Sequence, residues 1–587
     1  MATRAGWLAT ALALAAPGAA AGAITVRVET TPAPVLVVTS DADDAIVLTC
    51  DGDLRASRIV VNGVASDASC QSRVAVVGGP GPNRIDLGDL LLFSGNLKGP
   101  QGSVRIEAGA GDDEVTTPRA PYVLATVDGG PGSDRLVGGT VDTYVFGPAQ
   151  GVEVDTLVET AADRCDEPWQ AVGENPPMWD VLDLSLVEGD VAVDGAAPGG
   201  VLATTPGRTI RLERGGTGAI AVESASGGPG DDRLAGLCFA AGNGGDDLLG
   251  AAPGGALLLG GSGTDVLRGG AADDLLVGGA GDDRLLGGAG SDDLSGQAGD
   301  DVLRGGAGDD VYRFAAGDGR GHDVVDERPD GGSDVLSFDL PPGVPASVQL
   351  GAEDGVVARW GRARASVLRA RQIERVVGGR GDDLLVGDAG ANVLQGGGGR
   401  DVLAGGRGDD AYAVDPVAPL GAAGHWLGDY PVGAGDEPRP RYVGRCSSYE
   451  DDCPGTIPAW TTIDERPGGG VDTIVARGAE PFVRIDLAAR SVVVRTRRLL
   501  VDVARPGGTA FLEGAVGTNG PDVLLGNAAD NVLEGQLGRD TVRGGPGRDT
   551  CVIVRPGPST ENDDDLGSCE RTPIGSPYRS PFEPFPR

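Results

Sequence analysis

The stretch from Gly260 to Arg313 decides the fold. It consists of six consecutive nonapeptides without a gap: GGSGTDVLR, GGAADDLLV, GGAGDDRLL, GGAGSDDLS, GQAGDDVLR and GGAGDDVYR. Two weaker copies precede it, GNGGDDLLG from Gly242 and AAPGGALLL from Ala251. A fixed period of this kind indicates a repeat architecture in which each repeat stacks on its neighbours.

Each position of the nonapeptide has a physical role. Glycine at positions 1, 2 and 4 permits a tight turn, and aspartate at position 6 places a carboxylate beside that turn. Position 8 is a large apolar residue between two variable ones, which is typical of a very short strand with one inward side chain. Oxygen ligands on a flexible loop suit Ca²⁺ better than zinc or copper. The repeat therefore predicts short strands joined by calcium-binding turns.

These nonapeptides resemble the repeats of the RTX, or haemolysin-type, calcium-binding proteins, whose pattern is GGxGxDxUx with U a large apolar residue. The resemblance implies a parallel β-roll in which two nonapeptides form one coil and Ca²⁺ lies between stacked turns. It also implies that carbonyls of the glycine region and the position-6 aspartates are the ligands. Along the whole chain the predicted metal ligands are Asp232, Asp247, Asp265, Asp274, Asp283, Asp292, Asp301, Asp310, Asp383, Asp401, Asp410, Asp522, Asp540 and Asp549.

The composition favours an elongated all-β protein over a thick globular core. Glycine accounts for 102 of the 587 residues, and aromatic residues for only 4%. Such a chain can fill a core that is one side chain deep. We therefore predict an all-β fold, a parallel β-roll or β-solenoid of nonapeptide repeats with β-rich caps and spacers. A disordered Gly/Asp-rich linker is the alternative, but a linker has no need of an apolar residue in strict register.

The net charge of −38 argues against a nucleic-acid partner, because phosphate binding needs a basic face. It suits a polyanion that is neutralised by calcium ions, which we predict as the cofactor. The only two histidines are His322 and His425, and the chain has neither an HExxH zinc-protease motif nor a GxSxG nucleophile elbow. We therefore predict that the protein is not an enzyme.

The first 23 residues have the features of a secretory signal peptide. Arg4 supplies a positive charge, residues 7–16 an apolar core, and Ala21-Gly22-Ala23 a small-residue cleavage site. The apolar core is too short to span a bilayer, and no later stretch has the length of a transmembrane helix. We expect a secreted, extracellular protein. Because RTX proteins commonly lack such a signal, the export route stays open.

Eight cysteines without a CxxC pair predict disulfides in an exported chain. Several connectivities are compatible with the sequence, and proximity suggests Cys50–Cys70, Cys446–Cys453 and Cys551–Cys569, which leaves Cys165–Cys238. Cys551 takes the apolar position of the last repeat. A bridge from it to Cys569 would close the C-terminal end of the roll, as terminal repeats require.

A longer repeat is superimposed on the nonapeptides. Its three copies begin at Tyr144, Tyr312 and Tyr412, and two of them continue as DERPDGGSDVLSF from Asp326 and DERPGGGVDTIVA from Asp464. The acidic pairs Asp326-Glu327 and Asp464-Glu465 are not expected to act as general acid and base, because adjacent residues of a strand point to opposite faces. We interpret these copies as spacers through which the solenoid continues with longer loops.

The expected segments follow from these patterns. They are a signal peptide (1–23), a β-rich N-terminal cap (24–107), degenerate RTX repeats (108–139), a β-rich spacer with a Cys/Trp insert (140–226), the main RTX block (227–314), a second spacer (315–377), a second RTX block (378–414), a third spacer with a Cys insert (415–516), a third RTX block with its disulfide cap (517–571) and a disordered tail (572–587). An independent β-sandwich is the alternative for residues 24–107.

Two details rank the expected calcium sites. Asp113 and Asp134 hold position 6 in the degenerate repeats but look isolated from a stacking neighbour. Asn392 and Asn531 replace aspartate in the second and third blocks, which should therefore bind calcium more weakly than the main block.

The function that these observations favour is calcium binding coupled to folding, without catalysis. Two alternatives stay open. In one, calcium stiffens a cell-surface adhesin or scaffold, and the Cys-containing inserts bind a cell-surface glycan or a protein. In the other, the chain is a polysaccharide-active enzyme whose site lies within residues 24–230.

Overall fold

The computed structural model describes the chain in segments, and all of the regular elements in these segments are β-strands. Within them no helix has the length and apolar character needed to cross a membrane. The described residues are 12–14, 24–29, 35–41, 45–51, 58–69, 73–90, 102–119, 123–138, 142–159, 180–195, 201–214, 222–317, 321–327, 332–351, 356–367, 373–414, 459–464, 472–476, 483–487, 494–495, 499–504, 512–518, 520–536, 538, 540–552 and 569.

Several predicted features lie outside the described residues. They are most of the predicted signal peptide, Cys70, the inserts that contain Cys165, Cys446 and Cys453, and the tail from 572 to 587.

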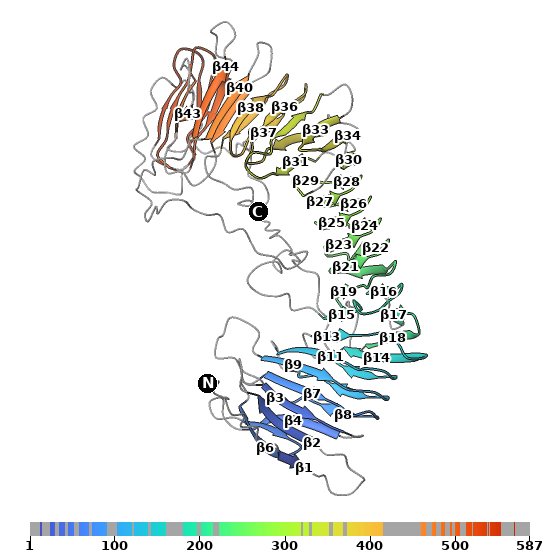
Figure 1. Ribbon diagram of the computed structural model, residues 1–587. Coiled ribbons are helices and arrows are strands. Elements are labelled where there is room, and N and C mark those ends of the chain that lie inside the picture. Colours follow the sequence, from blue (N-terminus) through green and yellow to red (C-terminus); the bar gives the residue numbers. More distant parts are fainter. Residues whose placement is uncertain are drawn as a thin grey trace, which may run out of the picture. The chain divides into compact units, whose positions relative to one another are not determined.

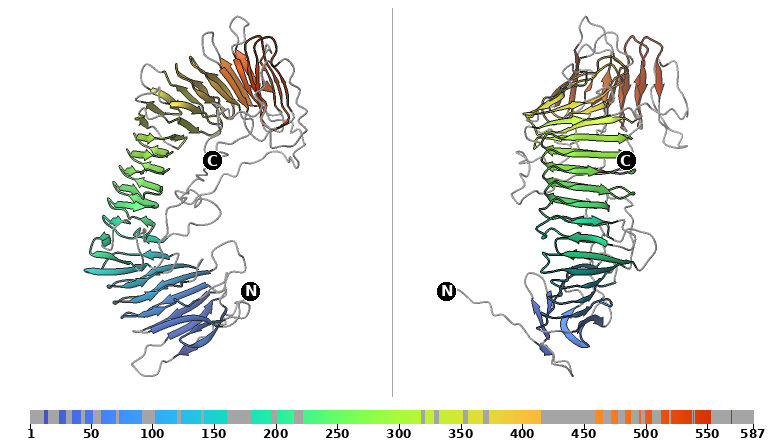
Figure 2. Two further views of the ribbon diagram at one scale, coloured as in Figure 1. Left: turned by 180° about the vertical axis from the view of Figure 1, so that it is seen from behind. Right: turned by 90° about the vertical axis from the view of Figure 1, so that its right-hand side faces the viewer.

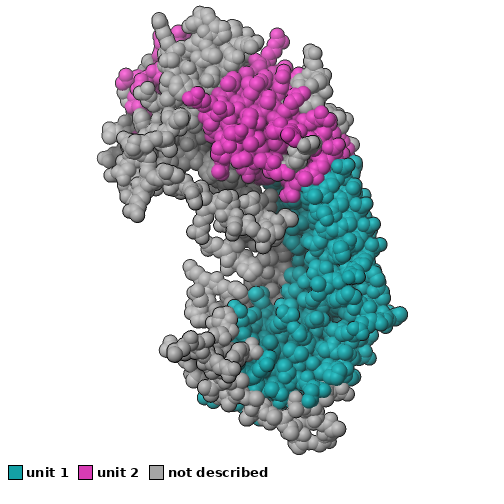
Figure 3. All heavy atoms as spheres, in the orientation of Figure 1, with its two compact units in different colours: residues 1–293 teal, residues 294–587 magenta. Residues whose placement is uncertain are grey.

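The chain divides into two compact units, residues 1–293 and 294–587 (Figure 3). The boundary falls within the main nonapeptide block. Both units are built from the same kind of coil, and each is considered by itself below.

One pair of coils in unit 1 explains the nine-residue period. Strand β23 (Leu257–Ser262) pairs in parallel with β25 (Leu275–Ala280), and β24 (Val266–Arg268) pairs in parallel with β26 (Arg284–Ala289) (Figures 1 and 2). Each pairing joins residues two nonapeptides apart, so two repeats make one coil and successive repeats alternate between two walls. We call β23 to β26 the central coils.

The core of the central coils is one apolar side chain deep on each wall. Leu258 and Leu276 on one wall, and Leu267 and Leu285 on the other, are fully buried. Each is the position-8 residue of its repeat, so the predicted inward side chain is the one observed. The structure thus confirms the parallel β-roll, and the strict apolar register excludes the linker alternative.

The N-terminal strands of unit 1 continue the same walls. Strand β3 (Val35–Thr39) pairs in parallel with β7 (Arg73–Val77), which pairs with β9 (Gly102–Glu107), which in turn pairs with β11 (Val123–Asp128). Strand β2 (Ile24–Glu29) lies antiparallel to β3, and β1 (Leu12–Leu14) lies antiparallel to β2. These strands of the predicted N-terminal cap therefore share a sheet with the coils that follow.

The spacers use their extra length for an antiparallel meander in one wall. In residues 310–377, which we call module 2, one wall continues through β29 (Val311–Ala315), β31 (Asp334–Asp339) and β35 (Ile373–Val377), all parallel. In the other wall β30 (His322–Val325) pairs in parallel with β34 (Ala363–Val367). Next to β34 lies β33 (Val356–Trp360), and next to β33 lies β32 (Ala346–Gln349), each antiparallel to its neighbour. The strands that come later in the chain therefore lie closer to β30 in this wall.

Modules 1 (residues 142–226) and 3 (residues 410–516) repeat this topology. The continuous wall consists of β13 (Asp142–Val145), β15 (Val181–Asp183) and β19 (Ser224–Ser226) in module 1, and of β39 (Ala411–Val414), β41 (Asp472–Ala476) and β45 (Leu512–Val516) in module 3. The meander consists of β14 (Glu153–Glu159), β18 (Arg208–Arg214), β17 (Val201–Thr205) and β16 (Ala192–Asp194) in module 1, and of β40 (Ala459–Asp464), β44 (Leu499–Ala504), β43 (Val494–Arg495) and β42 (Arg484–Asp486) in module 3.

Buried aromatic residues mark the start of each module. Tyr144, Tyr312 and Tyr412 are fully buried at equivalent places. In module 2, Phe314 stacks on Phe338 with ring centroids 5.2 Å apart, and Trp360 packs against both rings. The tyrosine with which each of the three longer repeats begins is thus a core residue at the junction between coil and spacer.

Candidate metal centres

The position-6 aspartates form a column along the turns. Oδ1 of Asp283 accepts a hydrogen bond of 2.8 Å from the backbone N–H of Asp265, and Oδ1 of Asp265 accepts one of 2.8 Å from the N–H of Asp247. The same bond joins Asp274 to Asp292, Asp383 to Asp401, Asn392 to Asp410, Asp522 to Asp540 and Asn531 to Asp549. Each carboxylate thus ties two coils together, and its like-charged neighbour lies one coil away.

The first aspartate of a column uses both oxygens for backbone hydrogen bonds. Oδ1 of Asp274 accepts from Ala256 N–H at 2.6 Å, and Oδ2 accepts from Gly270 N–H at 2.7 Å. We call an aspartate at the start of a column column-first. In each of the others, Oδ1 accepts from a backbone N–H of the preceding coil and Oδ2 accepts from a backbone N–H of its own turn; they are Asp232, Asp383 and Asp522. Both oxygens of these carboxylates are therefore satisfied by the protein itself.

Aspartates that follow in a column are different. Oδ2 of Asp247, Asp265 and Asp549 is buried and has no hydrogen-bond donor. Each of these residues is preceded in its column by Asp232, Asp247 or Asn531. Burying a carboxylate oxygen without a donor or a counter-ion is costly, so these oxygens suit a cation.

The pKa values of the aspartates in these columns are raised for the same reason, because burial disfavours the charged carboxylate. Burial raises the pKa of Asp247 to about 8 and that of Asp265 to about 6, from an ordinary value of 3.8. Burial, followed by the charge of Asp274, raises the pKa of Asp292 to about 8. Backbone hydrogen bonds act in the opposite direction but do not offset burial. The buried column therefore favours either protonation or a bound cation.

Because glycine at position 1 has no side chain, the position-6 carboxylate oxygen and a backbone carbonyl oxygen of the next coil can both lie close to it. A Cβ atom on Gly260 would lie 2.3 Å from Oδ2 of Asp265 and 2.5 Å from the carbonyl oxygen of Gly278 in the next coil. The same holds one coil earlier, where a Cβ on Gly242 would lie 1.9 Å from Oδ2 of Asp247 and 2.7 Å from the carbonyl oxygen of Gly260. Carboxylate and carbonyl oxygens gathered in this way are the hard ligands that Ca²⁺ prefers, so the donor set fits the ion that the repeat implies.

A second column of carboxylates lies outside the first. Oδ1 of the position-5 residues Asp246 and Asp273 accepts from the backbone N–H of Thr264 and Ser291, each at 2.7 Å, in the following coil. These aspartates are exposed. The two members of each Asp-Asp pair thus have different roles, because only the second is buried beside the glycine turn.

All fourteen predicted ligands lie at the buried position-6 site, with side chains no more than 2% exposed. Asn392 and Asn531 take the same place but use Oδ1 for the N–H of Asp388 and Asn527 in their own repeat, at 2.8 Å in each case. An amide that is engaged in this way adds no charge to the turn.

The degenerate repeats stack, contrary to the expectation that they are isolated. Asp113 accepts a hydrogen bond of 2.6 Å from Asn83 N–H, and Asp134 accepts one of 2.9 Å from Asp113 N–H. Asp155 continues this column by accepting from Asp134 N–H at 2.8 Å. The sequence hid this column because its coils are 21 or more residues long instead of 18.

Sequence reasoning also missed the carboxylates that carry the columns through the modules. In module 2, Asp323 accepts from Asp301 N–H, Asp334 from Asp310 N–H, and Glu374 from Asp334 N–H. The equivalent acceptors are Asp180 and Glu223 in module 1, and Asp472 and Glu513 in module 3. Each is an acidic residue two places before a buried wall residue, and that spacing is the signal that could have found them.

Three buried carboxylates converge at the start of module 2. The ligand atoms of Asp310, Glu327 and Asp334 lie within 4.8 Å of one another. The hydroxyl of Tyr312 donates to Glu327 and accepts from Gly305 N–H at 2.8 Å. These three carboxylates could hold a cation together.

The acidic pair Asp326-Glu327 does not converge on one place. Asp326 forms an ion pair with Arg304, whereas Glu327 is fully buried against Tyr312. Glu465, of the equivalent pair in module 3, lies outside the described residues. The two carboxylates of the described pair therefore face different partners, as the strand geometry predicts.

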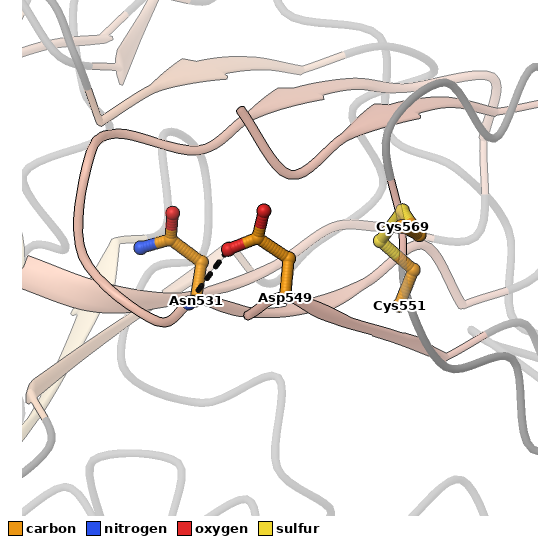
Figure 4. Close-up of a disulfide and its surroundings, with 4 residues drawn as sticks. All are labelled: Asn531, Asp549, Cys551 and Cys569. Atoms are coloured by element: carbon orange, nitrogen blue, oxygen red, sulfur yellow. Dashed lines mark hydrogen bonds between the residues drawn. A yellow bond between two sulfur atoms is a disulfide. The ribbon is translucent and has the colours of Figure 1, made fainter. Parts of the chain in front are cut away.

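The structure confirms the predicted C-terminal disulfide. Cys551 and Cys569 are joined, with their Cα atoms 5.9 Å apart, beside the last step of the column from Asn531 to Asp549 (Figure 4). Cys551 is fully buried and pairs with Leu533 in the wall, so the bridge begins at a core position. Cys50 and Cys238 are also in disulfides, but their partners lie outside the described residues, so those pairings stay predictions.

Acidification is expected to stabilise the calcium-free coils. Because folding raises the pKa of these aspartates above 3.8, the unfolded chain loses its protons first as the pH rises. The contribution to stability is therefore fully present below about pH 4 and is lost as the pH rises through about 6 to 8. The melting temperature of metal-free protein, followed by circular dichroism, should be higher at pH 5 than at pH 8. An equal or lower melting temperature at pH 5 would contradict the prediction.

Comparison with known protein families agrees with this geometry. The chain matches the RTX calcium-binding nonapeptide repeat in four places, at residues 259–294, 286–321, 377–412 and 516–551. These matches cover the main block from residue 259 onward, nearly all of the second block and the nonapeptides of the third, and they leave the N-terminal cap, the degenerate repeats and most of the spacers unmatched. A search of curated proteins finds no match to the chain.

Proposed function

Because the chain carries RTX calcium-binding nonapeptide repeats, we propose that it is a secreted, non-catalytic calcium-binding protein whose coils fold when Ca²⁺ binds. The observation that carries the proposal is the column of buried aspartates in which Oδ2 of residues such as Asp265 has no donor. Without calcium, these carboxylates repel one another along the column, and the glycine-rich turns lose much entropy on folding.

Calcium would offset both costs at the turns. Oδ2 of Asp265 and the carbonyl oxygen of Gly278 belong to adjacent coils and would hold an ion together, so that its binding free energy would contribute to folding. The position-8 leucines can then pack against each other in the walls. Folding and binding are therefore a single event in this proposal.

The proposed secretion is supported by the N-terminal signal-like segment and by the cysteines. All of the described cysteines, Cys50, Cys238, Cys551 and Cys569, are in disulfides. Disulfides persist in oxidising compartments outside the cytosol. Extracellular calcium modules bind with dissociation constants of roughly 10⁻⁴ to 10⁻³ M, so external calcium would keep such coils filled.

Two substitutions in neighbouring repeats test the proposed mechanism. Asp265→Asn removes a carboxylate whose Oδ2 has no donor, and should weaken calcium binding by about tenfold or more, a loss of about 1.4 kcal/mol. It should also ease folding without calcium, because one repelling charge is gone. Asp274→Asn alters a carboxylate that already accepts two backbone N–H groups, and should change the affinity much less.

Calcium binding to both variants can be measured by calorimetric titration of the metal-free protein. Unchanged affinity in both variants would refute the proposed role of the column. A loss of affinity that is larger for Asp274→Asn would refute the distinction between column-first and following aspartates.

A further inference from the structure

One buried cation of the protein lies among the coil turns. Arg208, at the start of β18, is only 3% exposed. Its guanidinium forms ion pairs with Glu153 and, at 3.1 Å, with Asp155. It also donates to the carbonyl oxygen of Gly130 at 3.1 Å and lies over the Phe146 ring, 5.2 Å from the centroid.

These partners are the kinds of oxygen that would hold calcium in the central coils. Asp155 is the last carboxylate of the column that runs from Asn83 through Asp113 and Asp134. Gly130 belongs to the glycine turn of the coil before it. The guanidinium therefore joins a column carboxylate to a turn carbonyl of the preceding coil, and so links two adjacent coils as an ion held by Asp265 and Gly278 would.

The other end of this column is also closed by protein donors. The side-chain amide of Asn83 donates to the carbonyl of Ala108 in the next coil at 2.9 Å, and to Gly81 at 2.6 Å. In the central coils, Oδ2 of Asp265 and the corresponding carbonyl oxygen of Gly278 both lie beside Gly260, and no hydrogen-bond donor reaches Oδ2. The first turn of the N-terminal column thus has an amide donor, and at the last turn a guanidinium charge lies 3.1 Å from Oδ2 of Asp155. Oδ2 of Asp134, one coil earlier, is buried without a donor as in the central coils, and the charge of Arg208 acts on it as a counter-charge.

Modules 2 and 3 lack this cation at the equivalent place. Pairing of β14 with β18 sets Glu153 opposite Arg208 and Asp155 opposite Ile210. By the same register, Arg208 corresponds to Ala363 in module 2 and to Leu499 in module 3. Asp155 corresponds to Asp323 in module 2 and to Thr461 in module 3. The built-in cation is thus specific to module 1 among the described modules.

We propose that Arg208 takes the place of Ca²⁺ at the end of the N-terminal column, so that the coils of residues 102–159 fold without calcium. The inference deepens the proposed function, on which it rests, by separating a calcium-independent start of the roll from the calcium-dependent central coils. A pre-folded start would offer the central coils a template, because each coil of a solenoid is stabilised by its neighbour.

Hydrogen exchange of the full-length protein in chelator tests the proposal. In the natural protein, amides of β12 (Arg135–Val137) and β14 should be protected while those of the central coils exchange. Arg208→Met keeps an apolar stem but leaves Glu153 and Asp155 without their cation. Exchange in β12 and β14 should then accelerate by about 100-fold or more, as expected when one partner of a buried ion pair is removed. Excess Ca²⁺ should restore protection by entering the vacated site.

Arg211→Gln is the matched control, because Arg211 is exposed on the same strand and should leave exchange unchanged. Protection of β12 and β14 that persists in Arg208→Met without calcium would overturn the proposal. Protection that is lost and not regained with calcium would also overturn it, since Arg208 would then only support packing. Central coils that stay protected in chelator would instead refute calcium-coupled folding, whatever Arg208→Met does.

Discussion

Removal of calcium from the full-length protein is expected to abolish most of the β-sheet signal of the central coils, and its return should restore that signal in a cooperative step. The reason is the run of buried carboxylates in adjacent coils, including Asp247 and Asp265, whose Oδ2 atoms have no donor. Each bound ion at a concentration of about 100 times its dissociation constant adds about 2.7 kcal/mol to stability. Several such contributions exceed the net stability of a typical domain.

Far-UV circular dichroism during a calcium titration of chelated protein measures this effect, and magnesium provides the control. Mg²⁺ demands a smaller octahedral site and gives up water reluctantly, so it should not replace calcium at these turns. The same β signal in chelator and in calcium would contradict coupled folding. Full recovery with magnesium would contradict the assignment of the sites to calcium.

The coil itself could be predicted from the sequence because its determinants are local. Gly260, Asp265 and Leu267 set the turn, the buried carboxylate and the inward side chain within one nonapeptide. Repetition then fixes the stacking, since residues 18 apart must meet when two repeats make a coil. The same locality made the bridge from Cys551 to Cys569 predictable, because its two cysteines are also 18 residues apart.

The properties that depend on stacking across irregular coils could not be predicted. Whether Oδ2 of an aspartate meets a donor depends on the residue one coil earlier, and after a meander that residue is not 18 positions away: Oδ1 of Asp383 accepts from Ala346 N–H, 37 positions before it. Arg208 reaches Gly130 across 78 positions of sequence, through a meander that no local pattern announces. Such contacts follow from register between strands that are far apart in the chain.

Gly281→Ala is expected to unstack the central coils even in saturating calcium. Gly281 has a φ of +132°, and a Cβ there would lie 1.8 Å from the carbonyl oxygen of Gly263 in the coil before. The backbone conformation alone costs an alanine about 1–3 kcal/mol, and the overlap adds to it because backbone on both sides must move. Coil spacing and ligand positions would change together, so calcium affinity should fall with stability.

Gly250→Ala is the control that separates steric overlap from a general loss of glycine. A Cβ on Gly250 meets only Ala235, at 3.9 Å, which is an ordinary contact. This variant should therefore stay within about 0.5 kcal/mol of the natural protein. Hydrogen exchange of β23 to β26 in calcium is the appropriate measurement, because coils of a solenoid unfold in neighbouring groups and a global midpoint would average them. Unchanged protection in Gly281→Ala would mean that the coils can separate at this turn at little cost, and that their spacing is not set by glycine-to-carbonyl contact.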